Sequence, residues 1–384
     1  MIRFAHKYQD IISTDNLLAA WEEFRNGRRS RNDVQIFEHD LMENILQLNK
    51  DLETKSYKHS KYTVFRISDP KPRVIHKAVV RDRLLHHALH RVLYPFFDKN
   101  FIADLYSCRV NKGSHAALTR FRKFYFKVSE NHTRTAWVLK CDIKKFFASI
   151  DHKILISTLK DYISDKSVIW ILSDVINSFE LDACKGLPLG NLTSQLFANI
   201  YMDRFDKFVK YVLKVKFYIR YTDDFVFMSH DKNALIELLP EINEFLWEDL
   251  RLELHEDKTS LKTVASGVDF LGWVHFPDHR VLRTATKRRM FRNITYNNGN
   301  KETVQSYLGL ISHGNTFKLR QEIAKLGFYC NLLLLFLCWL CNNERINLWL
   351  IPSTFLFRGE LFQDLVKVSL RPRFLFFLNR VGTK

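Results

Sequence analysis

The stretch from Phe217 to Met228 constrains this chain most strongly, because two runs of aromatic and β-branched residues flank a polar centre, Thr222-Asp223-Asp224. Such runs favour extended chain and a short polar centre favours a turn, so the stretch predicts a β-hairpin. A purely structural hairpin prefers Asn-Gly or Asp-Gly at its turn. Adjacent carboxylates repel each other unless a cation lies between them, and carboxylate oxygens suit Mg²⁺. The pair therefore indicates either a metal site or a solvated acidic turn.

A third carboxylate, Asp142, favours the metal site. It follows the apolar segment Trp137–Cys141, which is expected to be a strand. Together with Asp223 and Asp224 it would hold two Mg²⁺ ions, with Mn²⁺ as a substitute, in a site for in-line displacement at phosphorus. The alternative is that Asp142 caps the turn that follows it.

The composition favours a polyanionic partner. The chain has 384 residues, and its 59 Lys and Arg against 42 Asp and Glu give a formal net charge of +17. Such an excess points first to nucleic acid and second to an anionic membrane surface. The strongly apolar run at 332–340 is shorter than the roughly 20 residues of a membrane-spanning helix. With no apolar signal segment and no secreted-type cysteine framework, we expect a cytoplasmic protein without a membrane contact.

Hydrophobic spacing predicts an α+β chain in which helices are segregated from an antiparallel sheet. The proline at position 95 is expected to end the helix before it. Helices are expected over 15–24, 34–52, 81–93, 116–126, 152–162, 167–179, 194–211, 233–250, 287–293 and 304–310, and strands over 62–67, 74–75, 137–141 and 270–276.

Two segments resemble the catalytic boxes of reverse transcriptases. Tyr221–Asp224 resembles their tyrosine-x-Asp-Asp box, and Asp142–Phe147 resembles their first catalytic box. Further segments follow in the family's order. Segments 71–75, 81–85 and 101–118 are similar to the fingers of bacterial, group II intron-like enzymes. Segments 254–259 and 270–273 are similar to later palm boxes. The resemblance implies a right-hand polymerase fold and an RNA-directed DNA polymerase that uses Mg²⁺, dNTPs, template RNA and a primer to make cDNA.

The same resemblance, which runs from about residue 62 to 320, divides the chain into parts. The fingers, the palm with its antiparallel sheet and helices, and a short helical thumb follow an N-terminal extension. The expected bounds are a helical extension at 1–60, fingers at 61–135, palm at 136–276 with a fingers-like insertion at about 152–185, thumb at 277–327 and a C-terminal tail without an assigned role at 328–384.

Individual roles also come from the resemblance. Lys71 and Arg73 lie on a turn similar to the fingers' triphosphate grip, and Phe147 stands where the family places an aromatic gate against the ribose 2′-hydroxyl. Lys258 resembles a palm lysine proposed to protonate pyrophosphate. The plainer alternatives are a solvated basic turn, a core aromatic and a surface lysine. Residues expected to contact template or primer are Arg109, Lys112, Gly113, Tyr221, Gly272, Trp273, Lys287, Arg288 and Arg289.

The segment Leu189–Gln195 distinguishes subfamilies. Most reverse transcriptases carry Gln-Gly-x-x-x-Ser-Pro here, whereas this chain has leucine before Gly190 and Gln195 after serine. In both respects it resembles the reverse transcriptases of diversity-generating retroelements, as do segments 306–309 and 313–315. Those enzymes copy a template-repeat RNA with frequent errors opposite adenine, and the cDNA replaces a variable region of a target gene. They work with a small basic accessory protein that assembles as an oligomer.

Leu189, Gly190 and Gln195 are expected to face the incoming dNTP. Gly190 has no side chain and would let the nascent base pair approach the backbone. Leu189 cannot hydrogen-bond the nucleotide as a polar residue would, so we expect it to lower fidelity unless it serves only in packing. The alternatives are a retron, CRISPR-associated or phage-defence reverse transcriptase and a catalytically silent RNA-binding scaffold. The intact aspartates argue against the scaffold.

Overall fold

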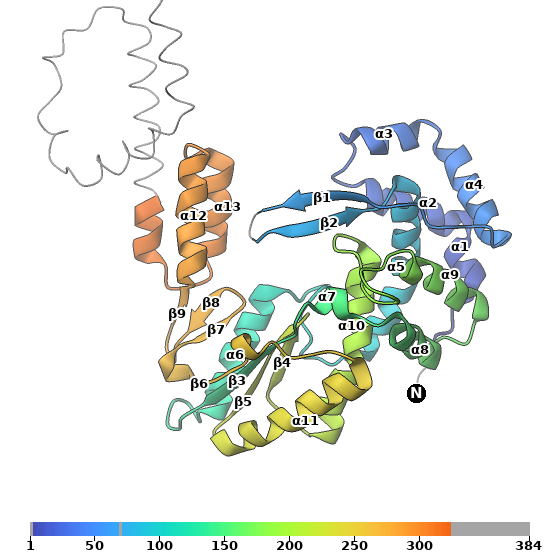
Figure 1. The fold of residues 1–384 in the computed structure, drawn as a ribbon. Coiled ribbons are helices and arrows are strands. Elements are labelled where there is room, and N and C mark those ends of the chain that lie inside the picture. The colour runs from blue at the N-terminus through green and yellow to red at the C-terminus, as the bar shows by residue number, and fades with distance from the viewer. Residues whose placement is uncertain (1–2, 69–70, 324–384) are drawn as a thin grey trace, which may run out of the picture.

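The computed structural model describes residues 3–68 and 71–323. The structure combines helices with antiparallel sheets, which agrees with the expected α+β class (Figure 1). The tail expected at 328–384, the end of the expected thumb and positions 69–70 of the fingers turn lie outside the described residues. Within the described ranges, none of the helices is long and apolar enough to cross a bilayer.

The N-terminal helices pack around one long helix, α5 (Val80–Asn100). We expected Pro95 to end it, but the helix continues for five residues, so this prediction is wrong. Leu93 and Phe97, on either side of the proline, are both buried, and their burial outweighs the roughly 3 kcal/mol that proline costs inside a helix. The other helices of this region are α1 (Tyr8–Ile12), α2 (Thr14–Arg25), α3 (Asn32–His39) and α4 (Leu41–Glu53).

The single helix expected at 34–52 is in fact two helices. Asp40 lies between α3 and α4 with φ −113° and ψ 40°, outside the helical region. The hydrophobic spacing continues across this break, which is why periodicity alone joined them.

A four-stranded antiparallel sheet forms the centre of the molecule. Its strands run in the order β4-β5-β3-β6, and its two faces contribute to two separate hydrophobic cores. Leu139 and Phe227 point into the core that contains α10 and α11, whereas Val138 and Val226 point into the core that contains α6. The bounds are β3 (Trp137–Asp142), β4 (Tyr218–Tyr221), β5 (Asp224–Ser229), β6 (Ser260–Thr263), α6 (Ser114–Val128), α10 (Leu192–Lys207), which a π-helix (Phe208–Val212) continues, and α11 (Lys232–Leu250).

Short helices connect the sheet to the N-terminal region. They are α7 (Phe146–Ser149), α8 (His152–Tyr162) and α9 (Lys166–Asn177), and a 3₁₀ turn, η2 (Glu256–Lys258), precedes β6. The hairpin of β1 (Thr63–Ile67) and β2 (Arg73–Lys77) reaches from the N-terminal helices toward the C-terminal helices α12 (Thr284–Tyr296) and α13 (Lys301–Ile311) (Figure 1).

A three-stranded sheet, β7 (Val268–Phe270), β8 (Trp273–His275) and β9 (Arg280–Leu282), precedes α12. We expected one strand over 270–276, and this prediction is wrong. Leu271 and Gly272 have φ of 49° and 84° and form the tight turn of a β7–β8 hairpin. Positive φ at both central positions is the geometry of a two-residue hairpin turn.

Candidate active site

The backbone brings the three aspartates to one end of the central sheet. Tyr221 pairs with Asp224 across β4 and β5, so Thr222 and Asp223 form a two-residue turn, as the hairpin prediction requires. In the β3–β5 register Asp142 lies opposite Asp224. The Ile143 N–H, directly after β3, donates to the Asp223 carbonyl at 3.2 Å. Carboxylates separated by about eighty residues in sequence therefore become neighbours through strand pairing.

Burial and mutual repulsion perturb this acidic group. Burial, with smaller contributions from Asp142 and Asp223, raises the pKa of Asp224 to about 7, while Lys140 acts in the opposite direction. Burial also raises the pKa of Asp223, helped by Asp142 and opposed by Lys258 and Arg73. The site thus favours a cation, because a bound cation relieves both the repulsion and the cost of burying charge.

Two lysines already approach the aspartates. Lys258 Nζ lies 2.5 Å from Asp142 Oδ2, which brings this predicted catalytic lysine to the site. Lys140 Nζ lies 3.5 Å from Asp224 Oδ1 without hydrogen-bond geometry, so this buried oxygen has no hydrogen-bond partner. Lys140 was not predicted. Its charge within an otherwise apolar strand was the available signal.

The donor atoms are of the type that Mg²⁺ prefers, since all are carboxylate oxygens, and one of them, Asp224 Oδ1, is buried without a hydrogen-bond partner. In the part of the chain that the structure describes, however, no group of three or more His, Cys, Asp or Glu side chains is already arranged to hold a metal ion. Lys258 and Lys140 are the cations nearest to the carboxylates.

The loop before α10 contacts the β1–β2 hairpin. The His76 N–H donates to the Leu189 carbonyl, and Asn191 Nδ2 donates to the His76 carbonyl, both at 3.1 Å. Gly190 has φ +107°, and a Cβ there would lie 2.9 Å from Ile75 Cγ2. The absence of a side chain at Gly190 therefore allows the β1–β2 hairpin to pack against this loop, a role that the sequence did not reveal.

The other residues expected at the nucleotide differ in exposure. Phe146 is buried and Phe147 is half-buried beside it, so Phe146 is the core member of the pair. Gln195 is exposed on the first turn of α10. Lys71 and Arg73 are exposed on the hairpin, and Arg73 is near enough to Asp223 to lower the pKa of that carboxyl.

Three residues expected to contact nucleic acid instead make contacts within the protein. Arg109 is 9% exposed and bonded to Asp98 at 2.6 Å, and Lys112 Nζ donates to the Ala103 carbonyl at 2.8 Å. Trp273 is buried and packs closely against Gly314. In this conformation Arg109 and Trp273 are largely enclosed by the protein, whereas Lys112 remains half-exposed.

The remaining positions of that group are distributed over four regions. Tyr221 is half-buried at the end of β4, Gly113 precedes α6 with φ +103°, and Gly272 lies in the β7–β8 turn. On α12, Arg288 is exposed and Arg289 is half-buried, while Lys287 Nζ lies 3.3 Å from Glu322 Oε2.

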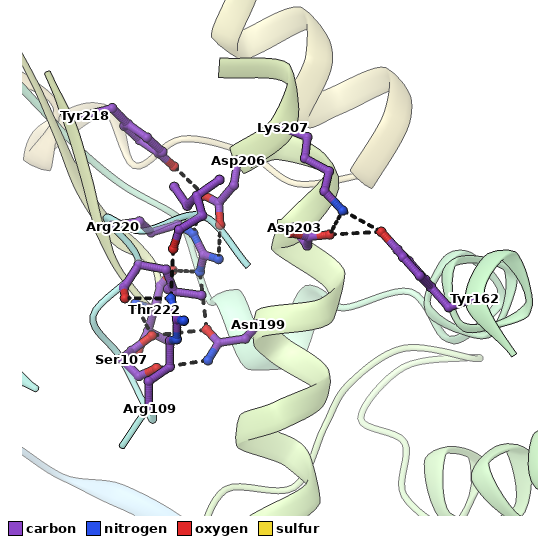
Figure 2. A network of polar contacts seen from close by, with 12 residues as sticks. Ser107, Arg109, Tyr162, Asn199, Asp203, Asp206, Lys207, Tyr218, Arg220 and Thr222 are labelled. Carbon is purple, nitrogen blue, oxygen red and sulfur yellow. Dashed lines mark hydrogen bonds and ion pairs between the residues drawn. The ribbon is translucent and has the colours of Figure 1, made fainter. Parts of the chain in front are cut away.

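A buried polar network behind the aspartate turn was missed by sequence reasoning (Figure 2). Arg220 is wholly buried on β4 and bonds Asp206 on α10 at 2.5 and 2.7 Å. It also donates to the Thr222 carbonyl at 2.9 Å. Thr222 has φ +58°, a conformation that costs a β-branched residue about 1–3 kcal/mol. An arginine within an apolar strand was the sequence signal.

Residues 60–275, more than half of the chain, match the family model for reverse transcriptase (RNA-dependent DNA polymerase). The chain belongs to the reverse transcriptase family. It is similar to Protein YkfC of Escherichia coli strain K12, with 25% identity over 57% of this chain and 66% of that protein. It is also similar to the group II intron-encoded protein LtrA of Lactococcus lactis subsp. cremoris, with 21% identity over 66% of this chain and 52% of LtrA.

A structure of telomerase from Candida albicans superposes with a TM-score of 0.46, at 11% identity over 61% of this reverse transcriptase and 48% of the telomerase chain. This reverse transcriptase spans slightly under two thirds of YkfC and about half of LtrA.

Proposed function

We propose that this chain is an RNA-directed DNA polymerase that extends a primer on template RNA by nucleotidyl transfer. The observation that carries the proposal is the strand register that sets Asp142 opposite Asp224, with Asp223 in the adjoining turn. When bound to these carboxylates, two Mg²⁺ ions, or Mn²⁺ in their place, would activate the primer 3′-hydroxyl and neutralise the departing pyrophosphate.

The chain's own side chains supply the other parts of the reaction. Arg73 and Lys71 bind the triphosphate, which the proximity of Arg73 to Asp223 supports. The Lys258 ammonium beside Asp142 donates a proton to pyrophosphate. Phe147 excludes a ribose 2′-hydroxyl by contact.

In this proposal the molecule works as a right hand. The β1–β2 hairpin belongs to the fingers, the four-stranded sheet forms the palm, and α12 and α13 form the thumb. Lys287, Arg288 and Arg289 on α12 contact template or primer phosphates, and the net charge of +17 supports such contacts. The direct test is extension of a DNA primer annealed to RNA in the presence of Mg²⁺ and dNTPs. A catalytically silent scaffold would bind the RNA and incorporate nothing.

We propose further that this polymerase serves a diversity-generating retroelement, in which error-prone cDNA from a template-repeat RNA diversifies a target gene in the cytoplasm. The resemblance of Leu189–Gln195 to that subfamily supports the proposal. A small basic oligomeric accessory protein would be the partner. The test is Leu189→Gln followed by sequencing of cDNA. Fewer errors opposite template adenine are expected, whereas an unchanged error spectrum would make Leu189 a packing residue only. A neighbouring near-repeat with adenine-restricted differences would distinguish this function from that of a retron, CRISPR-associated or phage-defence enzyme.

A further inference from the structure

We propose that four buried side chains, Ser107, Asn199, Asp206 and Arg220, position the turn that carries two of the catalytic aspartates. We call these four residues the turn clamp. The inference rests on the proposed polymerase function and adds residues that the chemistry itself does not require. They are positioning residues, because they act through the backbone of Thr222.

The turn clamp holds both backbone polar groups of Thr222. The Thr222 N–H donates to Ser107 Oγ at 3.0 Å, and Arg220 Nη1 donates to the Thr222 carbonyl at 2.9 Å. The hairpin ladder closes at the Tyr221–Asp224 pair, so side chains rather than strand pairing satisfy the backbone groups of Thr222.

The clamp residues are themselves fixed to α10 (Figure 2). Ser107 Oγ donates to Asn199 Oδ1 at 3.1 Å, and Asn199 Nδ2 returns a bond to the Ser107 carbonyl at 3.0 Å. Asp206, one end of the bidentate pair with Arg220, also lies on α10 and accepts from Tyr218 Oη at 2.8 Å. The orientation of the turn is therefore fixed by contacts with the buried helix α10 as well as by the sheet.

Thr222 requires such support because of its conformation. A β-branched residue rarely adopts φ +58°, and without external bonds it would relax toward negative φ. That rotation would reorient the peptide leading into Asp223 and turn Asp223 away from Asp142, whereas strand pairing would still hold Asp224 opposite Asp142. A displacement of about 1 Å in a reacting group can lower the rate about 100-fold.

The test uses Ser107→Ala in the full chain, since replacing one member of the buried Arg220–Asp206 pair would strand a charge. We expect kcat for dNTP incorporation to fall about 10- to 100-fold with little change in KM. The Mg²⁺ concentration for half-maximal rate should rise, and amide exchange in the peptide 217–228 should become faster. Adding Thr222→Gly should restore part of kcat, because glycine adopts positive φ without strain.

Ser129→Ala is the matched control. Ser129 is equally buried, and its Oγ accepts the His132 N–H at 3.1 Å in a turn where 130, 131 and 132 all have positive φ. It should lose a similar amount of thermal stability with kcat unchanged. Wild-type kcat and Mg²⁺ dependence in Ser107→Ala, or losses equal to those in Ser129→Ala, would overturn the proposal.

A wild-type chain that incorporates no nucleotide would overturn the polymerase function and leave the clamp testable. Amide exchange of 217–228 and binding of Mn²⁺ alone, followed by electron paramagnetic resonance, need no turnover. Faster exchange and weaker Mn²⁺ binding in Ser107→Ala than in Ser129→Ala would support the clamp. Equal behaviour of the two variants would refute it.

Discussion

Replacing Gly190 with alanine perturbs the contact between the loop before α10 and the β1–β2 hairpin. Keeping the contact would cost about 1–3 kcal/mol for the 2.9 Å approach to Ile75 and about 1–3 kcal/mol for the backbone at φ +107°. Releasing the hairpin instead breaks the two hydrogen bonds of His76, worth together about 2 kcal/mol. A released loop can also relax its φ, so releasing the hairpin costs less free energy than keeping the strained contact.

The shift from the docked to the released hairpin is set by the strain that alanine adds to the docked state, and the low end of that strain, about 2 kcal/mol, corresponds to a roughly 30-fold shift. Because Arg73 lies on β2, Gly190→Ala should raise the KM for dNTP by up to about 30-fold, with a smaller effect on kcat and on the melting temperature. Steady-state incorporation at varied dNTP, together with a thermal melt, measures all three.

Two variants separate the steric effect from the backbone effect. Gly27→Ala also places a side chain at positive φ, +70°, but has no atom within 4 Å of the new Cβ, so KM should not change. Ile75→Ala combined with Gly190→Ala removes the clash and should recover most of the KM of Ile75→Ala alone. An unchanged KM in Gly190→Ala, or no recovery in the double variant, would refute the reasoning.

Three further predictions concern other sites. Phe147→Ala should raise incorporation of rATP relative to dATP about 10- to 200-fold in direct competition, since an opened gate admits the 2′-hydroxyl; an unchanged ratio would make Phe147 a packing residue only. Burial lowers the pKa of His86 and of His275 to about 3, so the fold keeps both neutral while the unfolded chain takes up protons below about pH 6.5. Burial also lowers the pKa of His87 and His90 to about 4, so the four rings together should lower the free energy of unfolding by about 5 kcal/mol between pH 7.5 and pH 5.5. Asp224, whose pKa is raised to about 7, takes up a proton in the folded state over the same range and offsets about 2 kcal/mol. Urea melts should therefore show a free energy of unfolding about 3 kcal/mol lower at pH 5.5 than at pH 7.5, and equal values would contradict the burial of these rings. Lys258→Gln should lower kcat about 100-fold or more, because the variant cannot donate a proton to pyrophosphate; a normal kcat would exclude proton donation by Lys258.

The sequence predicted those helices and strands whose hydrophobic pattern is local and long enough to show a period. The stretch 217–228 alternates around a polar centre, and the structure pairs it as the expected hairpin. The three strands of the β7–β9 sheet have only three residues each, too few for a period of two to register. The turn at Leu271–Gly272 also lacks the Asn or Asp that marks such hairpins.

The candidate site also has a part that the sequence predicted and a part that it did not. Residue type and the order of the two catalytic boxes were enough to predict Asp142, Asp223 and Asp224. The hydrogen bond between Ser107 and Thr222 joins residues 115 positions apart, and no local pattern encodes it. The contact of Gly190 with Ile75 is likewise long-range, so sequence reasoning related the absent side chain to the nascent base pair and could not foresee that Ile75 of the hairpin also approaches it.

Primer extension on an RNA template, compared between the wild-type chain and Asp223→Asn, tests the central claim most directly. The matched control is Asp231→Asn, because Asp231 Oδ1 caps α11 and an asparagine can keep that cap. The account predicts Mg²⁺-dependent cDNA synthesis by the wild-type chain and by Asp231→Asn, and none by Asp223→Asn at an unchanged melting temperature. Synthesis by Asp223→Asn, or none by the wild-type chain with Mg²⁺ or Mn²⁺, would contradict it.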